Sequence, residues 1–309
     1  MADRPLFSYY GGKQRLAPKL VPLIPPHAIY VEPFAGGAAL LFAKGRPETT
    51  GSDHYREILN DKNALIANLY QVARERPAEL KHLLDHTLYS SAEHRSATNI
   101  CKGLVPATEL QKAWAVYVAI QFSTNNKIGG GICFQTVGRV NPDTHQNYLL
   151  TLPASCERLK RVFIECRDAL EIVKNWDRPQ TFFYCDPPYP GSDQGHYNGY
   201  STKEFNALVE ALENCQGAYM LSCYDAEGLR APRDAERIEF KATCTATRKG
   251  DRERVEVVYR RPAKVAPRPG LRLFDGSTML PVEQAGDEPE AIAGLPPDLM
   301  AILKSTYEG

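Results

Sequence analysis

Short apolar runs that end in polar or glycine-containing loops recur along the chain, and this pattern predicts the strands of a sheet. Between them, apolar residues recur at helical spacing, as in Ala64–Arg74, where Leu65, Ile66, Leu69 and Val72 share one face. Strands that alternate with helices predict an α/β fold. The predicted strands cover or end near these positions: Ile29–Val31, Asp61, Cys166, Thr181–Phe183, Ala218–Ser222 and Val255–Tyr259.

Two further helices are indicated by their ends. Arg15–Leu23 follows a glycine turn and is predicted to end before Pro25 and Pro26. Ser201 and Glu204 have the spacing of a capping box, which predicts a helix that runs to Asn214.

The alternation of strands and helices stops between Glu75 and Asn147. This stretch contains a predicted helix, Leu110–Phe122, followed by the amides and glycines of Ser123–Gly131. Its polar amides, with Lys127 and Arg139, would suit a surface that reads base edges. A purely structural loop is the alternative.

Composition bounds the kind of protein. The 309 residues are 43% hydrophobic and 24% charged, as in soluble globular proteins. We see no apolar run of membrane-spanning length and no export signal, so a cytoplasmic protein with reduced thiols is expected. The net charge is zero, so a nucleic-acid partner would need a local basic face. Pro262–Gly270 is predicted to be a linker, and Pro297–Tyr307 a short amphipathic helix.

The most informative stretch for chemistry is Asp186-Pro187-Pro188-Tyr189, directly after an apolar run. The prolines stiffen the turn and favour an extended residue before them, so we expect Asp186 at the end of a buried strand. A carboxylate, the Pro187 carbonyl and the Tyr189 ring could receive a flat, aminated ring and aim its nitrogen lone pair at a methyl donor. A plain strand followed by a Pro-Pro turn is the alternative.

A second candidate site is the small-residue turn after the first predicted strand, Glu32-Pro33-Phe34-Ala35-Gly36-Gly37. It is placed like the first βα turn of a nucleotide-binding sheet but lacks the dinucleotide and triphosphate motifs. Glu32 suits a cation or a polar tail. Asp61 is placed to take a ribose diol, and Asp168 to accept from an adenine amino group.

In order along the chain, Tyr10-Gly11-Gly12-Lys13, Val31–Gly37, Asn60–Asn63 and Asp186–Tyr189 resemble the motifs of the Dam-like (D12 class) DNA adenine N6-methyltransferases. The resemblance covers roughly residues 5 to 261. It implies a Rossmann-like seven-stranded methyltransferase sheet with an inserted, mostly helical target-recognition domain. The implied domains are residues 1–74 and 151–261 for catalysis, 75–150 for target recognition, and 262–309 as a C-terminal linker and extension.

The same resemblance implies S-adenosylmethionine as methyl donor, no metal, and double-stranded DNA as partner, with a monomer or weak dimer and no membrane. Asp186, Pro187, Pro188 and Tyr189 would be catalytic, acting on a flipped adenine. The implied cofactor-binding residues are Tyr10, Gly11, Lys13, Glu32, Pro33, Phe34, Ala35, Gly36, Gly37, Asp61, Asp168 and Asp186. The candidate DNA-binding residues are Lys13, Asn126, Lys127, Arg139, Tyr197 and Tyr200.

Three alternatives stay open. The same chemistry could act on another amine: cytosine N4, an RNA adenine or a glutamine side chain. The protein could be a DNA-binding module that has lost catalysis, although the intact Asp186–Tyr189 motif argues against this. The enzyme could belong to a phage, act alone, or be the modification half of a restriction system. Gly36-Gly37-Ala38-Ala39 departs from the family's usual glycine pattern, and no target sequence is implied.

Overall fold

The computed structural model describes most of the chain. The described residues are 4–46, 55–134, 142–190, 200–224, 228–243, 253–266, 273–274 and 279–280.

A sheet of seven strands in the order β3-β2-β1-β4-β5-β7-β6 forms the centre of the molecule. Neighbours from β3 to β5 are parallel, whereas β7 is antiparallel to both β5 and β6. This confirms the predicted Rossmann-like α/β fold. The strands are β1 Ile29–Glu32, β2 Arg56–Asn60, β3 Val162–Glu165, β4 Thr181–Cys185, β5 Ala218–Cys223, β6 Glu236–Thr243 and β7 Glu253–Arg261.

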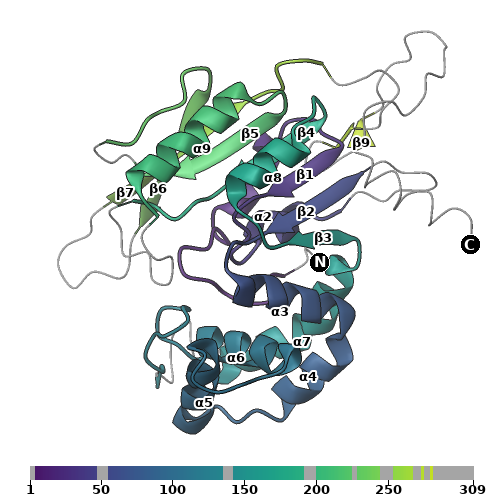
Figure 1. Cartoon of the computed structure of the whole chain (residues 1–309), viewed down its shortest axis with the longest axis vertical. Coiled ribbons are helices and arrows are strands. Elements are labelled where there is room, and N and C mark those ends of the chain that lie inside the picture. The colour runs from purple at the N-terminus through teal and green to yellow at the C-terminus, as the bar shows by residue number, and fades with distance from the viewer. Residues whose placement is uncertain are drawn as a thin grey trace, which may run out of the picture.

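Helices cover both faces of the sheet because successive strand residues point to opposite sides. Tyr30 belongs to the apolar core on one face, and the next residue, Val31, belongs to the core on the other. Helices α8 (Ala169–Trp176) and α9 (Thr202–Asn214) pack in the second core and lie in front of the sheet in Figure 1. The first core holds α1 (Ala17–Leu20), η1 (Val21–Leu23), α2 (Ala39–Lys44) and α3 (Ala64–Glu75).

The helix predicted over Arg15–Leu23 is shorter and changes type on the way. It consists of α1 and the single 3-10 turn η1, each of which carries a proline at its first or second position. The predicted capping box of Ser201 and Glu204 is confirmed at the start of α9.

The stretch that interrupts the strands forms a helical group on the far side of α3 from the sheet (Figure 1). The predicted helix Leu110–Phe122 is confirmed as α6, shifted by one residue. Its side chains are buried from Ala115 to Gln121 because α3 and α5 pack on different sides of it. The domain limits expected from the sequence remain predictions. The limit expected after residue 150 falls within helix α7. The group comprises α4 Pro77–Asp85, α5 Ser91–Cys101, α6 Glu109–Gln121 and α7 Pro142–Leu159.

Part of the C-terminal extension packs on the seven-stranded sheet. Phe274, in the two-residue strand β8 (Leu273–Phe274), exchanges backbone hydrogen bonds of 3.0 and 2.7 Å with His27, just before β1. Its ring lies against His27 and Tyr55. β8 pairs with β9 (Met279–Leu280). The helix predicted over Pro297–Tyr307 lies outside the described residues.

None of the helices in the described part of the chain has the length and apolar composition that crossing a lipid bilayer requires.

Candidate active site

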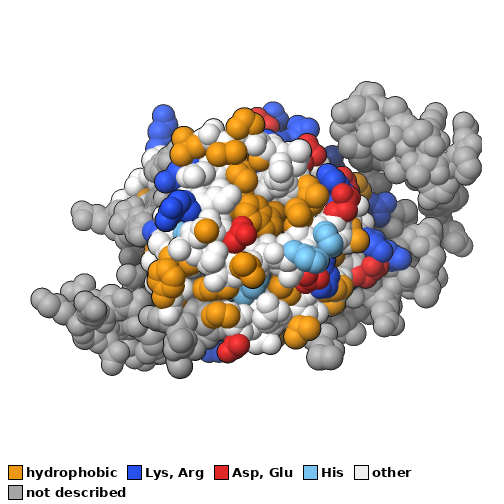
Figure 2. Space-filling model, turned by 90° about the horizontal axis from the view of Figure 1, so that it is seen from below, with side chains coloured by type: hydrophobic (Ala, Val, Ile, Leu, Met, Phe, Trp, Pro, Cys, Tyr) orange, Lys and Arg blue, Asp and Glu red, His pale blue; other side chains and the backbone are white. Residues whose placement is uncertain are grey.

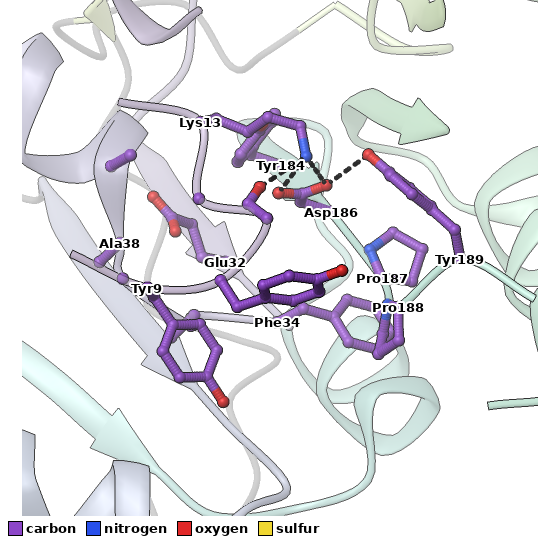
Figure 3. Close-up of a pocket in the computed structure, with 17 residues that line it drawn as sticks. Tyr9, Lys13, Glu32, Phe34, Ala38, Tyr184, Asp186, Pro187, Pro188 and Tyr189 are labelled. Atoms are coloured by element: carbon purple, nitrogen blue, oxygen red, sulfur yellow. Dashed lines mark hydrogen bonds and ion pairs between the residues drawn. The ribbon is translucent and has the colours of Figure 1, made fainter. Parts of the chain in front are cut away.

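A pocket opens at the carboxyl ends of β1 and β4. The chain leaves β1 toward β2 and β3 on one side and returns to β4 on the other. Adjacent strands whose connections diverge leave a crevice between them, where α/β proteins bind ligands. Three segments meet there: the N-terminal loop, the turn after β1 and the end of β4 (Figure 3). The lining residues are Tyr9, Tyr10, Gly11, Gly12, Lys13, Glu32, Phe34, Ala35, Gly36, Gly37, Ala38, Ala39, Tyr184, Asp186, Pro187, Pro188 and Tyr189.

The turn after β1 is held in a left-handed conformation by its neighbours. Gly36 and Ala38 have φ angles of 46° and 49°. The Gly36 amide donates to Asp61 at 2.9 Å, and its carbonyl accepts from the Tyr70 hydroxyl at 2.8 Å. Gly37 suits this position because it has no side chain: an added Cβ would lie 3.2 Å from the Tyr9 Cβ, which is closer than most such contacts. The small residues therefore leave the turn's backbone facing the pocket.

Asp61 lies behind this turn and does not line the pocket. Its carboxylate accepts from the amides of Gly36 and Asn63, both at 2.9 Å. Burial raises its pKa to about 6, although these two hydrogen bonds oppose the shift. Asp61 thus fixes the turn in this structure, and its predicted contact with a ribose stays a prediction.

Glu32, the last residue of β1, presents a buried carboxyl to the pocket. One of its oxygens accepts from the Tyr30 hydroxyl and, at 2.9 Å, from the Leu41 amide in the first turn of α2. Burial raises the pKa of Glu32 to about 8 despite these hydrogen bonds. The pocket wall therefore contains an acid that gains charge within the physiological pH range.

Asp186 follows the last residue of β4 and joins a compact network of polar side chains. Lys13 Nζ donates to its two oxygens at 2.7 and 2.9 Å, and the Tyr189 hydroxyl donates to Oδ1 at 2.8 Å (Figure 3). Both donors also contact Glu256 on β7: Lys13 Nζ lies 3.1 Å from Oε1, and the Tyr189 hydroxyl 3.0 Å. The structure thus brings Lys13 together with the acid and the tyrosine of the motif.

The charges of this network determine its protonation. Burial alone would lower the pKa of Lys13, but the nearby charges of Asp186 and Glu256 outweigh it and raise the pKa above its ordinary value. Burial raises the pKa of Glu256, and the Lys13 charge opposes that shift. Lys13 is therefore a permanent cation between two acids.

Glu256 is the residue of this network that the sequence did not point to. It stands between Val255 and Val257 in an otherwise apolar part of the last predicted strand. An acid within such a run is a usable signal, because charged side chains are rarely buried without partners.

The pocket mouth adjoins the loop that follows α6. The Tyr10 amide donates to the Asn126 carbonyl at 2.9 Å, and Lys127 Nζ lies 5.3 Å from the centre of the Tyr10 ring. Tyr10 itself is 39% exposed and lines the pocket. Two candidate DNA-binding residues of the insert therefore lie beside the pocket rather than at the insert's outer end. At that end, basic, acidic and apolar side chains are interspersed (Figure 2).

The remaining candidates lie around or outside the pocket. The Tyr200 ring packs edge-on against Phe34 at 5.8 Å. Pro33 is buried and accepts from Asn60 through its carbonyl at 2.9 Å. Asp168 caps α8 and pairs with Lys62 at 3.0 Å, away from the pocket lining. Arg139 and Tyr197 lie outside the described residues.

Comparison with known proteins gives a family and a similar bacterial protein. The model of the family described as D12 class N6 adenine-specific DNA methyltransferase matches residues 9–100 and 141–243. The chain is also similar to the Type II methyltransferase M1.LlaDCHI of Lactococcus lactis subsp. cremoris, with 26% identity over 214 residues, which cover 66% of this chain and 72% of the relative.

Both matched segments contribute to the pocket, and the unmatched residues between them fall in the helical insert. The first segment supplies the glycine turn and Lys13, and the second supplies Asp186. Since the match extends over more than half of the sequence, the chain belongs to the D12 class N6 adenine-specific DNA methyltransferase family and is a DNA methyltransferase with a Rossmann-like fold.

Proposed function

We propose that the protein transfers a methyl group from S-adenosylmethionine to the N6 amino group of adenine in double-stranded DNA, after the base has left the helical stack. The observation that carries the proposal is the position of Asp186. Its carboxylate lies just past the end of β4, lines the pocket, and stands next to Pro187 and Tyr189.

The pocket has features that suit the proposed methyl donor. S-adenosylmethionine supplies a positively charged sulfonium whose methyl group a nucleophile can attack. The turn from Ala35 to Ala38 offers backbone without bulky side chains, and Glu32 offers a buried carboxyl that a nearby cation would ionise. Tyr10 and Phe34 supply flat aromatic surfaces. These residues would hold the donor at the end of β1.

Asp186 would act on the amine of the target base. The lone pair of an adenine amine is delocalised into the ring, which makes the nitrogen a poor nucleophile. Hydrogen bonds from the amine to Asp186 and to the Pro187 carbonyl would localise that pair on nitrogen. The nitrogen could then form its new bond to the methyl carbon, while the electrons of the broken S–C bond return to sulfur, and afterwards release one proton.

A base within the duplex cannot reach such a pocket, so the target must be flipped out, which costs a few kcal/mol of stacking and pairing energy. The Tyr189 ring, at the pocket wall, is the side chain we assign to stack on the flipped base. Tyr224 packs edge-on against this ring at 4.5 Å and limits its rotation.

Expression in a host without DNA methylation tests the proposal. Nucleosides from the recovered DNA are separated by mass spectrometry, and the modified positions are sequenced. We expect N6-methyladenine at one recurring sequence. N4-methylcytosine without N6-methyladenine, or methylation of RNA alone, would contradict the proposed substrate.

Variants at Asp186 test the mechanism in the same assay. Asp186→Ala and Asp186→Asn should lose methyl transfer while calorimetry still detects cofactor binding. Glu210→Gln, which removes one charge from the exposed side of α9, serves as control and should keep wild-type activity. If the wild-type protein bound DNA but no S-adenosylmethionine, a DNA-binding module without catalysis would be favoured instead.

A further inference from the structure

Glu256 is a buried carboxylate beside the proposed catalytic acid, and the transfer described above does not use it. It lies on β7, antiparallel to β5, and its side chain is 8% exposed. A buried carboxylate is costly unless donors compensate for the lost water. Glu256 has two such donors, Lys13 Nζ at 3.1 Å and the Tyr189 hydroxyl at 3.0 Å.

The same two groups donate to Asp186, at slightly shorter distances of 2.7 and 2.8 Å to Oδ1. Asp186 and Glu256 therefore share one ammonium and one hydroxyl. Each donor can lengthen its contact with one acid and shorten its contact with the other by a small movement. The total charge of the four groups does not change in this exchange.

This sharing matters because the donors occupy the acid that should receive the target amine. Lys13 contacts both oxygens of Asp186, and Tyr189 adds a second contact to Oδ1. A lysine ammonium also neutralises the carboxylate, which weakens its pull on an amine hydrogen. Asp186 must therefore shed part of these contacts before it can accept from a base.

We propose that Glu256 is a positioning residue that takes over Lys13 and the Tyr189 hydroxyl when a target amine reaches Asp186. The inference rests on the proposed function and adds a residue to it. Glu256 touches neither the base nor the methyl donor in this scheme. It acts through Lys13 and Tyr189, and the step is an exchange of hydrogen bonds without bond making or proton transfer.

A structural role would have different consequences. If Glu256 served only to offset the charge of Lys13, its loss would lower the stability of the fold and leave turnover in the folded protein unchanged. Turnover and stability therefore have to be measured separately.

The test compares Glu256→Gln and Glu256→Asp with the wild-type protein, using unmethylated DNA and S-adenosylmethionine. Glutamine keeps the shape and an acceptor oxygen but has no charge, whereas aspartate keeps the charge on a shorter side chain. We expect Glu256→Gln to lower kcat about 10- to 100-fold, the factor that corresponds to one hydrogen bond to a charged group. The KM values for DNA and cofactor should stay within about twofold, since the lost interaction belongs to the reacting state.

Glu256→Asp should have a several-fold higher kcat than Glu256→Gln. Its melting temperature should equal that of the wild-type protein. The matched control is Glu236→Gln on the neighbouring strand β6. Glu236 is exposed and pairs with Arg260 at 3.5 Å, so its loss removes the same charge from the same hairpin. This control should keep wild-type kcat.

The outcomes separate the two proposals. If the wild-type protein methylates no base, the proposed function fails, and the role of Glu256 fails with it. If the wild-type protein is active and Glu256→Gln keeps kcat within twofold, only the inference about Glu256 is overturned. A loss confined to KM would overturn it as well. Should Glu256→Gln not fold, wild-type kcat in Glu256→Asp would overturn the inference, and a several-fold lower kcat at unchanged KM would support it.

Discussion

Glu32 gives the pocket wall a charge that depends on pH. Its carboxyl is buried under the turn that leads into α2, and burial holds its pKa near 8 instead of the ordinary 4.5. Between these pH values the folded protein keeps a proton that the unfolded chain releases. Ionisation of Glu32 therefore opposes folding, and its contribution to stability falls as the pH rises through this window.

Glu32→Gln should remove this pH dependence. We expect the free energy of unfolding of the variant, relative to wild type, to increase from pH 5.5 to pH 8 by up to about 1.4 kcal/mol per pH unit. Urea unfolding at several pH values measures it. Asp61 also has a raised pKa, but it contributes equally to the unfolding free energy of both proteins and therefore does not affect the difference. A difference that stays constant with pH would show that Glu32 is ionised throughout.

Ala38 and Ala39 offer a comparison of two adjacent alanines in different conformations. Ala38 is left-handed, with φ at 49°, whereas Ala39 begins α2, and both are buried. Glycine relieves the strain of the first position but adds chain entropy in the second. We expect Ala38→Gly to be at least about 1 kcal/mol more stable than Ala39→Gly in chemical denaturation. Equal stabilities would argue against strain at Ala38.

The sequence predicted the site's residues where chemistry and chain order define them. Lys13, Glu32 and Asp186 were singled out by type and by their place beside glycines, prolines or strand ends, and the structure brings all three to one pocket. Glu256 was not predicted because only the pairing of β7 with β5 brings it there. The inward turn of Asp61 toward Gly36 was not predictable either, since it depends on the shape of the turn.

At the scale of elements, a network of buried ion pairs connects the end of α7 to the sheet. Glu57 on β2 accepts from Arg158 in the last turn of α7 through two hydrogen bonds of 2.6 and 2.7 Å, and from Lys44 of α2 at 2.5 Å. Burial would raise the pKa of Glu57, but these two cations dominate and lower it to about 2.

Glu57→Gln should destabilise the protein strongly, because it leaves two buried cations without their acid. A loss of about 3–5 kcal/mol is expected from such one-sided removals. Glu165→Gln on the next strand is the control: Glu165 pairs with Arg167 near the surface, where such pairs contribute less than about 1 kcal/mol. Urea unfolding of both variants at pH 7 gives the comparison, and similar losses would contradict the role of the network.

The elements that the sequence predicted are those with a clear period. Buried central strands such as β4 are continuous apolar runs, and α3 has a regular apolar stripe. The edge strand β6, Glu236–Thr243, mixes charges with apolar residues because only β7 pairs with it, so its pattern resembles a loop. Helix α7 was missed because Pro153 and scattered polar residues interrupt its apolar spacing.

On the scale of the whole molecule, DNA must approach a protein without net charge. Lys127 lies beside Tyr10 at the pocket mouth. We expect Lys127→Ala to weaken DNA binding and to reduce the slope of log affinity against log salt by about 1, the effect of one lost phosphate contact. Cofactor affinity should not change.

Lys81→Ala is the matched control for this measurement. Lys81 pairs with Asp85 on the surface of α4, within the same insert. Fluorescence anisotropy at several salt concentrations gives both slopes. Equal slopes for the two variants would contradict a phosphate contact by Lys127.

The two acids of the pocket stand on neighbouring strands that are locked in register, with Val31 opposite Phe183. Glu32 ends one strand and Asp186 follows the other, so backbone pairing sets the spacing between the donor's cradle and the acceptor's acid. The helical group meets this arrangement at its rim, where the Tyr10 amide donates to the Asn126 carbonyl and Lys127 lies over the Tyr10 ring. Under the proposed function, the helical group α4–α7 can therefore evolve to recognise different DNA sequences while the geometry of the reaction stays the same.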